Sequence, residues 1–163
     1  MARRNKILIN PDPKGRRLEG VIDTALTPKP GQVVQIKASA GIDSNGNFTF
    51  ELYNADADGG RPKGPIIVLL EDDGQGKTVS DAYAAGNLAP GYIPLPGDEL
   101  NLLLLDIAGT ADDHTIGEML IIDDTTGKFI ATTGSPESEP AQLLETITDP
   151  VADTLAHCIW TGY

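Results

Sequence analysis

The stretch that decides the fold is Asp43-Ser-Asn-Gly-Asn-Phe-Thr-Phe-Glu-Leu-Tyr53. Its second half alternates strictly, so that Phe48, Phe50 and Leu52 fall on one face of an extended strand and polar residues fall on the other. Its first half contains an Asn-Gly pair, the dipeptide that most favours a tight hairpin turn. The stretch therefore predicts a β-hairpin with one buried face.

Further strands are predicted on both sides of this hairpin. Alternating or continuous apolar runs, separated by turn residues, lie at residues 32–37, 65–70, 100–106, 118–123, 128–132, 142–148 and 154–160. One short helix is expected at 80–85, with Ser80 as its N-cap and Gly86 at its C-cap. The prolines and glycines of residues 88–97 predict a long ordered loop.

This pattern predicts an all-β fold, a compact barrel or sandwich of jelly-roll-like or β-tulip-like form, with an extended N-terminal arm. We assign residues 1–19 to a basic extended arm and residues 20–163 to a single all-β domain. Residues 97–100 and 117–120 are similar strand entries, but two such copies do not predict a solenoid or propeller.

Length and composition exclude several protein classes. The chain has 163 residues and a mass of 17.2 kDa, which fits one domain. A single cysteine, Cys158, excludes an intrachain disulfide and a cysteine-based zinc site. No apolar run approaches the roughly 18 residues of a membrane span. Only three apolar residues follow Lys6 before a polar turn, so we expect a protein made without a signal peptide.

The charge is distributed unevenly along the chain. Six of the twelve basic residues lie in the first 17 positions, where Asp12 is the one acidic residue; they are Arg3, Arg4, Lys6, Lys14, Arg16 and Arg17. Residues 18–163 then carry six basic and 23 acidic side chains, a net charge of −17. Such an acidic body disfavours binding to nucleic acid or to an anionic membrane. The basic segment either docks on a separate acidic partner or lies on its own acidic body.

Motifs that could carry chemistry are incomplete. The run from Ile66 to Thr78 resembles a phosphate-binding loop, but Glu71 stands where the first glycine is needed and two aspartates follow. Acidic loops at residues 43–47, 56–58 and 72–73 offer oxygen ligands for calcium, yet none completes a calcium-binding loop, and the aspartates equally suit turns.

The residues that could act in catalysis are also poorly placed. His157 and Cys158 are adjacent in a predicted strand and so point to opposite faces, while His114 lies in a polar turn. We therefore predict no catalytic, cofactor or metal site, and no enzyme.

Several segments carry a resemblance to a known family. They are Asp58–Asp72, Gly76–Gly86, Gly91–Leu100, Gly117–Lys128 and Glu145–Tyr163. In overall pattern these segments resemble the capsid decoration (cement) proteins of tailed bacteriophages, over roughly residues 30–163. The basic arm lies outside the resemblance.

The resemblance implies an all-β structural protein without cofactor or catalysis. It would bind the major capsid protein on the outer surface of the virion, as a homotrimer at quasi-threefold points of the expanded head, and stabilise the shell. The basic arm would contribute contacts to the capsid. An alternative is a carbohydrate-binding or adhesin β-module, which requires an exposed aromatic platform; Tyr53, Tyr83, Tyr92 and Trp160 are the residues available for it.

Overall fold

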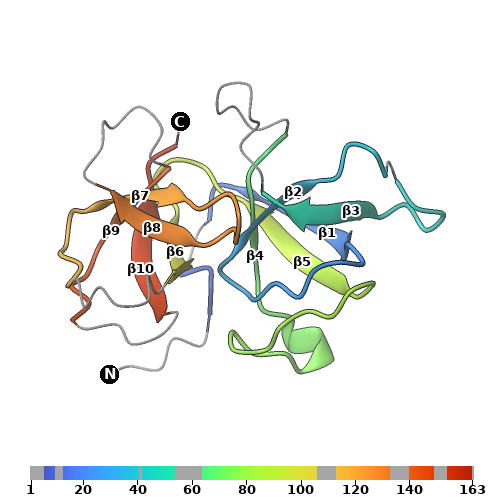
Figure 1. Cartoon of the computed structure of the whole chain (residues 1–163), viewed down its shortest axis with the longest axis horizontal. Helices are drawn as coiled ribbons and strands as arrows, with labels where there is room; N and C mark the ends of the chain where they lie inside the picture. The colour runs from blue at the N-terminus through green and yellow to red at the C-terminus, as the bar shows by residue number, and fades with distance from the viewer. Residues whose placement is uncertain are drawn as a thin grey trace.

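The chain folds into two small β-barrels that lie side by side (Figure 1). The computed structural model describes residues 6–9, 13–40, 42–53, 64–105, 113–132, 140–148 and 154–162. These residues form ten strands and a single 3-10 turn, η1 (Asp73–Gln75). The all-β prediction is confirmed, and its form is a pair of barrels.

The first barrel closes on itself in the strand order β1-β3-β2-β4-β5. Its strands are β1 (Arg16–Ile22), β2 (Val33–Ile36), β3 (Phe48–Leu52), β4 (Ile67–Leu69) and β5 (Leu88–Ile93). The pair β1 and β3 is parallel, and the other four neighbouring pairs are antiparallel. The predicted hairpin forms β2 and β3, with Phe50 fully buried inside the barrel.

The second barrel repeats the topology of the first. Its order is β10-β6-β8-β7-β9, formed by β6 (Glu99–Leu104), β7 (Met119–Ile122), β8 (Phe129–Thr132), β9 (Ala141–Leu143) and β10 (Thr154–Trp160). Here the parallel pair is β6 and β8, the counterparts of β1 and β3. Strand for strand, β6 to β10 therefore correspond to β1 to β5.

The correspondence extends to single hydrogen bonds. The Gly31 N–H donates to the Leu69 carbonyl over 2.8 Å, and at the equivalent positions the Gly117 N–H donates to the Leu143 carbonyl over 2.8 Å. The strand registers superimpose in the same way, and several equivalent positions hold the same residue: Leu18 and Leu100, Gly31 and Gly117, Ile36 and Ile122, Phe50 and Phe129, Leu69 and Leu143, Leu70 and Leu144, Glu71 and Glu145, Leu88 and Leu155, Ala89 and Ala156. The described strands therefore form the same five-stranded unit twice in tandem, a repeat that we call the duplication.

Two apolar clusters hold the barrels together. The smaller cluster fills the first barrel, around Phe50 and Tyr83. The larger cluster fills the second barrel around Phe129 and also includes Val68 and Tyr92 from the first barrel. Because this cluster contains side chains from both units, the barrels share a continuous apolar contact.

Two local predictions are wrong. Residues 80–85 form no helix: the Asp81 carboxylate accepts a hydrogen bond from the Thr78 N–H, which closes a turn, and Tyr83 is buried. Residues 88–93 form strand β5 instead of a loop, in spite of Pro90. Proline has no N–H to donate to the neighbouring strand, and opposite Pro90, just beyond the end of β4, stands Leu70. The Leu70 carbonyl accepts a hydrogen bond from the Tyr83 hydroxyl over 2.7 Å instead, so the strand tolerates Pro90.

Candidate functional site

The basic residues near the N-terminus are the predicted functional residues, and the structure separates them into three groups. Arg3 and Arg4 lie outside the described residues. Lys6 lies against the body of the protein. The remaining three, Lys14, Arg16 and Arg17, are exposed, and the last two belong to β1. The first strand of the barrel therefore begins inside the segment that the sequence assigned to the arm.

Residues 6–9 form a short strap on the second barrel. Leu8 pairs antiparallel with Leu100 of β6. On either side of this pair, the Ile9 N–H donates to the Glu99 carbonyl over 3.0 Å and the Asn101 N–H donates to the Ile7 carbonyl over 2.7 Å. The Ile7 side chain is fully buried in the larger apolar cluster. The strap is thus an additional piece of sheet with its own core residue.

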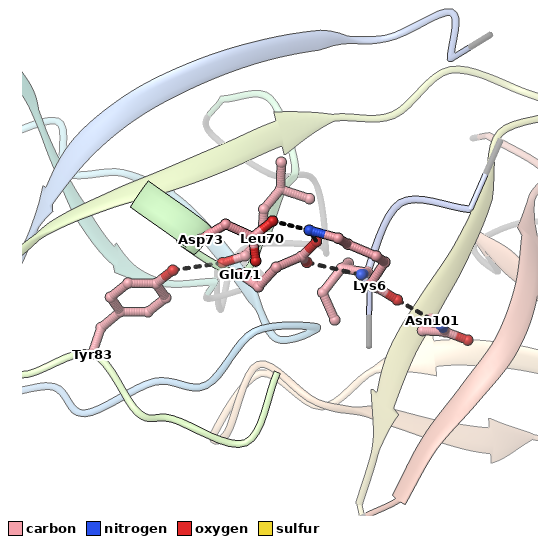
Figure 2. Close-up of polar contacts among 7 residues, drawn as sticks. Lys6, Leu70, Glu71, Asp73, Tyr83 and Asn101 are labelled. Atoms are coloured by element: carbon pink, nitrogen blue, oxygen red, sulfur yellow. Dashed lines mark hydrogen bonds and ion pairs between the residues drawn. The ribbon is translucent and has the colours of Figure 1, made fainter. Parts of the chain in front are cut away.

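An acidic cluster on the first barrel holds the other side of the strap (Figure 2). The Lys6 ammonium group pairs with the Asp73 carboxylate and lies 3.4 Å from a Glu71 oxygen. The second Glu71 oxygen accepts a hydrogen bond from the Ile7 N–H over 2.8 Å. The strap therefore contacts both barrels, and for these residues the structure matches the alternative in which the basic segment lies on its own acidic body.

The duplication explains why Glu71 can hold the strap. The counterpart of Glu71 in the second barrel is Glu145, which accepts a hydrogen bond from the His157 N–H over 2.6 Å. The counterpart of His157 is Pro90, which has no N–H. Because this internal donor is missing in the first barrel, the Glu71 carboxylate can accept from Ile7 instead.

A buried carboxylate fixes the chain where it enters β1. Asp98 is fully buried and accepts hydrogen bonds from the Lys14 N–H over 2.9 Å, the Leu95 N–H over 2.8 Å and the Tyr92 hydroxyl over 2.6 Å. Burial acts to raise the pKa of the Asp98 carboxyl, but these hydrogen bonds outweigh it and hold the pKa below its usual range. Burial, together with the bond to Asp98, raises the pKa of Tyr92 to about 12.

This anchoring places three exposed basic residues at the start of the first barrel, which we call the basic patch: Lys14, Arg16 and Arg17. Arg16 and Arg17 are neighbours in β1, so their side chains project from opposite faces of the strand. Because Lys14 is anchored through its backbone, its ammonium group projects from a fixed point next to β1. On a chain with a net charge of −12, the patch is a local reversal of charge suited to an acidic surface.

The acidic loops that were considered as calcium ligands, and for which no metal site was predicted, use their carboxylates internally. Asp43 accepts from the backbone N–H groups of Asn45 and Asn47, each over 2.8 Å, as in a turn. Asp72 caps η1 and Asp73 pairs with Lys6, while residues 56–58 lie outside the described residues. In the described part of the chain, no three His, Cys, Asp or Glu side chains come together as metal ligands would.

The two histidines each face a carboxylate. His114 Nδ1 lies 3.2 Å from Glu118, and His157 Nε2 lies 3.0 Å from Glu99. Cys158 is buried inside the second barrel, whereas the His157 ring is partly exposed, so the predicted opposite orientation of this pair is confirmed. Each of these contacts joins one histidine to one carboxylate.

The aromatic residues needed by the carbohydrate alternative are buried. The exposed fractions are 3% for Tyr53, 0% for Tyr83, 1% for Tyr92 and 4% for Trp160. The edge of Trp160 borders a shallow apolar depression of about 300 Å³ with Pro94 and Pro96. The described residues that line it are apolar or glycine, so the depression offers a sugar no polar side chain.

Sequence reasoning missed Glu71, Asp98 and the strap. In the sequence, an isolated carboxylate after an apolar run does not indicate that it accepts a hydrogen bond from the backbone N–H of a residue 64 positions earlier. The Leu-Leu-Glu sequence at residues 69–71 and 143–145 is the one local signal that could have linked Glu71 to Glu145.

Comparisons with known proteins add no assignment. No protein-family model matches the chain, and no curated protein is significantly similar to it. The one helical segment in the described residues is the single turn η1, which is too short to cross a membrane.

Proposed function

We propose that this chain is a structural protein of a tailed-bacteriophage virion. It binds the major capsid protein on the outside of the expanded head, as a homotrimer at quasi-threefold points, and stabilises the shell. The observation that carries the proposal is the exposed basic patch of Lys14, Arg16 and Arg17 on an acidic all-β body. The resemblance of residues 30–163 to decoration proteins supports the same reading.

The acidic body and the basic patch have complementary roles in this proposal. Like-charged outer surfaces keep virions apart, while the patch provides attraction toward acidic groups of the shell. A protein that binds only the expanded lattice stabilises it by mass action, by about 2.7 kcal/mol per site at a hundredfold excess over Kd. Repetition of that term over many sites would oppose the internal pressure of packaged DNA.

The buried state of the four aromatic residues favours this proposal over a carbohydrate-binding module. A sugar platform needs an aromatic face open to solvent, and Tyr53, Tyr83, Tyr92 and Trp160 are each at most 4% exposed.

The test is co-sedimentation of the purified protein with emptied, expanded phage heads. Deleting residues 1–17 would be a poor variant, because it removes buried Ile7 and the start of β1. The variant of choice is Lys14→Ala/Arg16→Ala, which removes two exposed cations of the patch. The control is Lys29→Ala, which removes an exposed cation that lies outside the patch.

We expect saturable binding of the wild-type protein at a stoichiometry matching threefold sites. The patch variant should bind about tenfold more weakly, with the control unchanged. Absence of saturable binding would overturn the capsid proposal, and retention of a glycan by the same protein would establish the carbohydrate module. Equal binding by the patch variant would exclude the patch as the contact.

A further inference from the structure

The duplication gives each barrel an equivalent tight turn just before its second strand. In the first barrel the Gln32 N–H donates to the Lys29 carbonyl over 3.2 Å, and in the second barrel the Glu118 N–H donates to the Thr115 carbonyl over 3.2 Å. Side chains brace both turns: the Gln32 carbonyl accepts from the Lys29 N–H, and the Glu118 carboxylate accepts from the Thr115 hydroxyl. Each turn is therefore held by a backbone bond and a side-chain bond.

The turn of the first barrel docks on the second barrel. The Leu103 N–H of β6 donates to the Gly31 carbonyl over 3.0 Å. A Cβ added to Gly31 would stand 2.8 Å from the Leu155 side chain of β10, so the turn approaches the second barrel closely. Pro30, the second residue of the turn, is buried. Within the chain, a turn of this kind is therefore already a contact between barrels.

The turn of the second barrel holds an apolar residue in solvent at the same position. Ile116 is the counterpart of Pro30, yet its side chain is 64% exposed, the largest value for any large apolar residue in the described part of the chain. Because the turn is already braced, little conformational freedom would be lost if Ile116 inserted into another surface. The turn thus presents a pre-organised apolar anchor.

The shallow apolar depression beside Trp160 is a matching surface. Its volume is about 300 Å³, and both barrels line it. The first barrel contributes Pro65, Ile66 and Ile93, the second contributes Trp160, and Pro94 and Pro96 come from the connection between them. The depression therefore offers an isoleucine side chain apolar contact on several sides.

Two cations lie at the rim of the depression. The Lys14 ammonium group lies beside Gly97, the residue that follows Pro96. Arg16 lies opposite Ile93 in the ladder between β1 and β5. The depression is thus an apolar site with a basic rim, suited to an apolar side chain that belongs to an acidic segment.

Charge selects the turn of Ile116 as the occupant. Residues 112–124, which include this turn, carry five carboxylates and no lysine or arginine. The other isoleucine that is more than half exposed, Ile42, lies in residues 37–47, where one lysine and one aspartate cancel. Opposite charges therefore favour the approach of Ile116, and not of Ile42, to the basic rim.

We propose that Ile116 of one copy of the chain inserts into the depression of a second copy. The contact joins two different surfaces, so each copy offers its turn to one neighbour and its depression to another. Such a contact closes into a ring or continues as an open row of copies. The contact itself does not depend on binding to a capsid; only a ring of exactly three copies, the homotrimer proposed above, rests on that function.

Sedimentation velocity across a concentration series, in the absence of phage heads, tests the proposal. We expect the wild-type protein to form a particle whose mass is a multiple of 17.2 kDa. Ile116→Asp removes the anchor, and Pro65→Asp/Pro96→Asp places two carboxylates at exposed positions of the depression. Each variant should self-associate at least about tenfold more weakly, because apolar contact is lost and a carboxylate would be buried or repelled. Both variants leave the cations of the basic patch unchanged.

A mixture of the two variants tests whether the contact joins different surfaces. Ile116→Asp retains the depression and Pro65→Asp/Pro96→Asp retains Ile116, so one contact remains possible between them. At a concentration about a hundredfold above that of wild-type assembly, the mixture should form a particle of two chains. The matched control is Ile42→Asp, the same change at the other exposed isoleucine, which should leave the wild-type mass. Circular dichroism establishes that each variant is folded.

Four outcomes would overturn the proposal. They are a wild-type protein that stays a single chain at all concentrations, an oligomer whose mass is the same in Ile116→Asp, an equal loss of self-association in Ile42→Asp, and two folded variants that do not associate when mixed. This contact and the capsid proposal fail separately. A protein that stays a single chain in solution but binds expanded heads saturably would overturn the contact and leave the capsid proposal in place.

Discussion

Replacing Ile7 with alanine should destabilise the whole protein, although Ile7 lies only six residues from the N-terminus. Its side chain is fully buried in the apolar cluster that contains residues of both barrels. Its backbone is bonded on both sides, by Glu71 and by Asn101, so the strap cannot readily move to close the cavity. Truncating a buried isoleucine costs about 2–5 kcal/mol, and a rigid site favours the middle of that range, about 3 kcal/mol.

The measurements are urea unfolding, which gives the free energy of unfolding, and thermal unfolding, which gives Tm, both followed by circular dichroism. About 3 kcal/mol corresponds to a fall in Tm of about 6–12 °C for a chain of this size. The matched control is Ile9→Ala, because Ile9 belongs to the same strap but is 38% exposed; this change should cost under about 1 kcal/mol. Equal effects of the two variants would refute the reasoning, since they would mean that the strap is not docked as described.

Three further predictions follow from single contacts. Glu71→Gln should lower the free energy of unfolding by about 1–2 kcal/mol, because it weakens the charged acceptor of the Ile7 N–H and the pair with Lys6; an unchanged urea midpoint would contradict this. Because the pKa of Asp98 is lowered in the folded protein, its carboxylate contributes fully to stability above the unfolded pKa of about 3.9, and this contribution is lost as the pH falls through the lower folded pKa. The free energy of unfolding should therefore change less with pH in the acid range for Asp98→Asn than for the wild type. Gly31→Ala should lower the free energy of unfolding by about 3 kcal/mol and Gly117→Ala by about 1 kcal/mol. Both glycines have positive φ, at 86° and 95°, but an added Cβ would come within 2.8 Å of another atom at Gly31 and would meet none at Gly117. Equal losses of stability in chemical denaturation would disprove that distinction.

The sequence predicted those strands whose apolar residues all face a core. The continuous run at 65–70 became β4, buried on both faces because it lies between the first barrel and the contact with the second. Sequence reasoning failed for β1, because exposed arginines and a single partly buried leucine are also typical of a solvated arm, and only the partner strands identify the segment as a strand. It failed for β5 because Pro90 disrupts a strand only where a ladder bond is required, and that depends on where β4 ends.

The duplication was hidden from the sequence for a similar reason. The sequence that follows Gly117 resembles the sequence that follows Gly97, whereas the structural counterpart of Gly117 is Gly31. The connections between equivalent strands differ in length, so the spacing that would reveal a repeat is lost. Backbone hydrogen bonds tolerate many side chains, and matching registers therefore persist where few identical residues remain.

The candidate site was predictable in part. Charge counting alone identified the basic cluster near the N-terminus, and Lys14, Arg16 and Arg17 are indeed exposed. That Lys6 would pair with Asp73 was not predictable, because the pair joins residues 67 positions apart through tertiary structure.

The strap also sets the order in which the protein can finish folding. Each barrel is built from one contiguous stretch of chain, so the first can form while the second is still being synthesised. The strap belongs to the beginning of the chain, yet it pairs with β6, which is synthesised about 90 residues later; at 5–20 residues per second the delay is roughly 5–20 s. During that interval the strap has no strand to pair with, and its later docking joins it to the second barrel. Two similar units that would otherwise unfold separately are thereby expected to unfold in one cooperative transition.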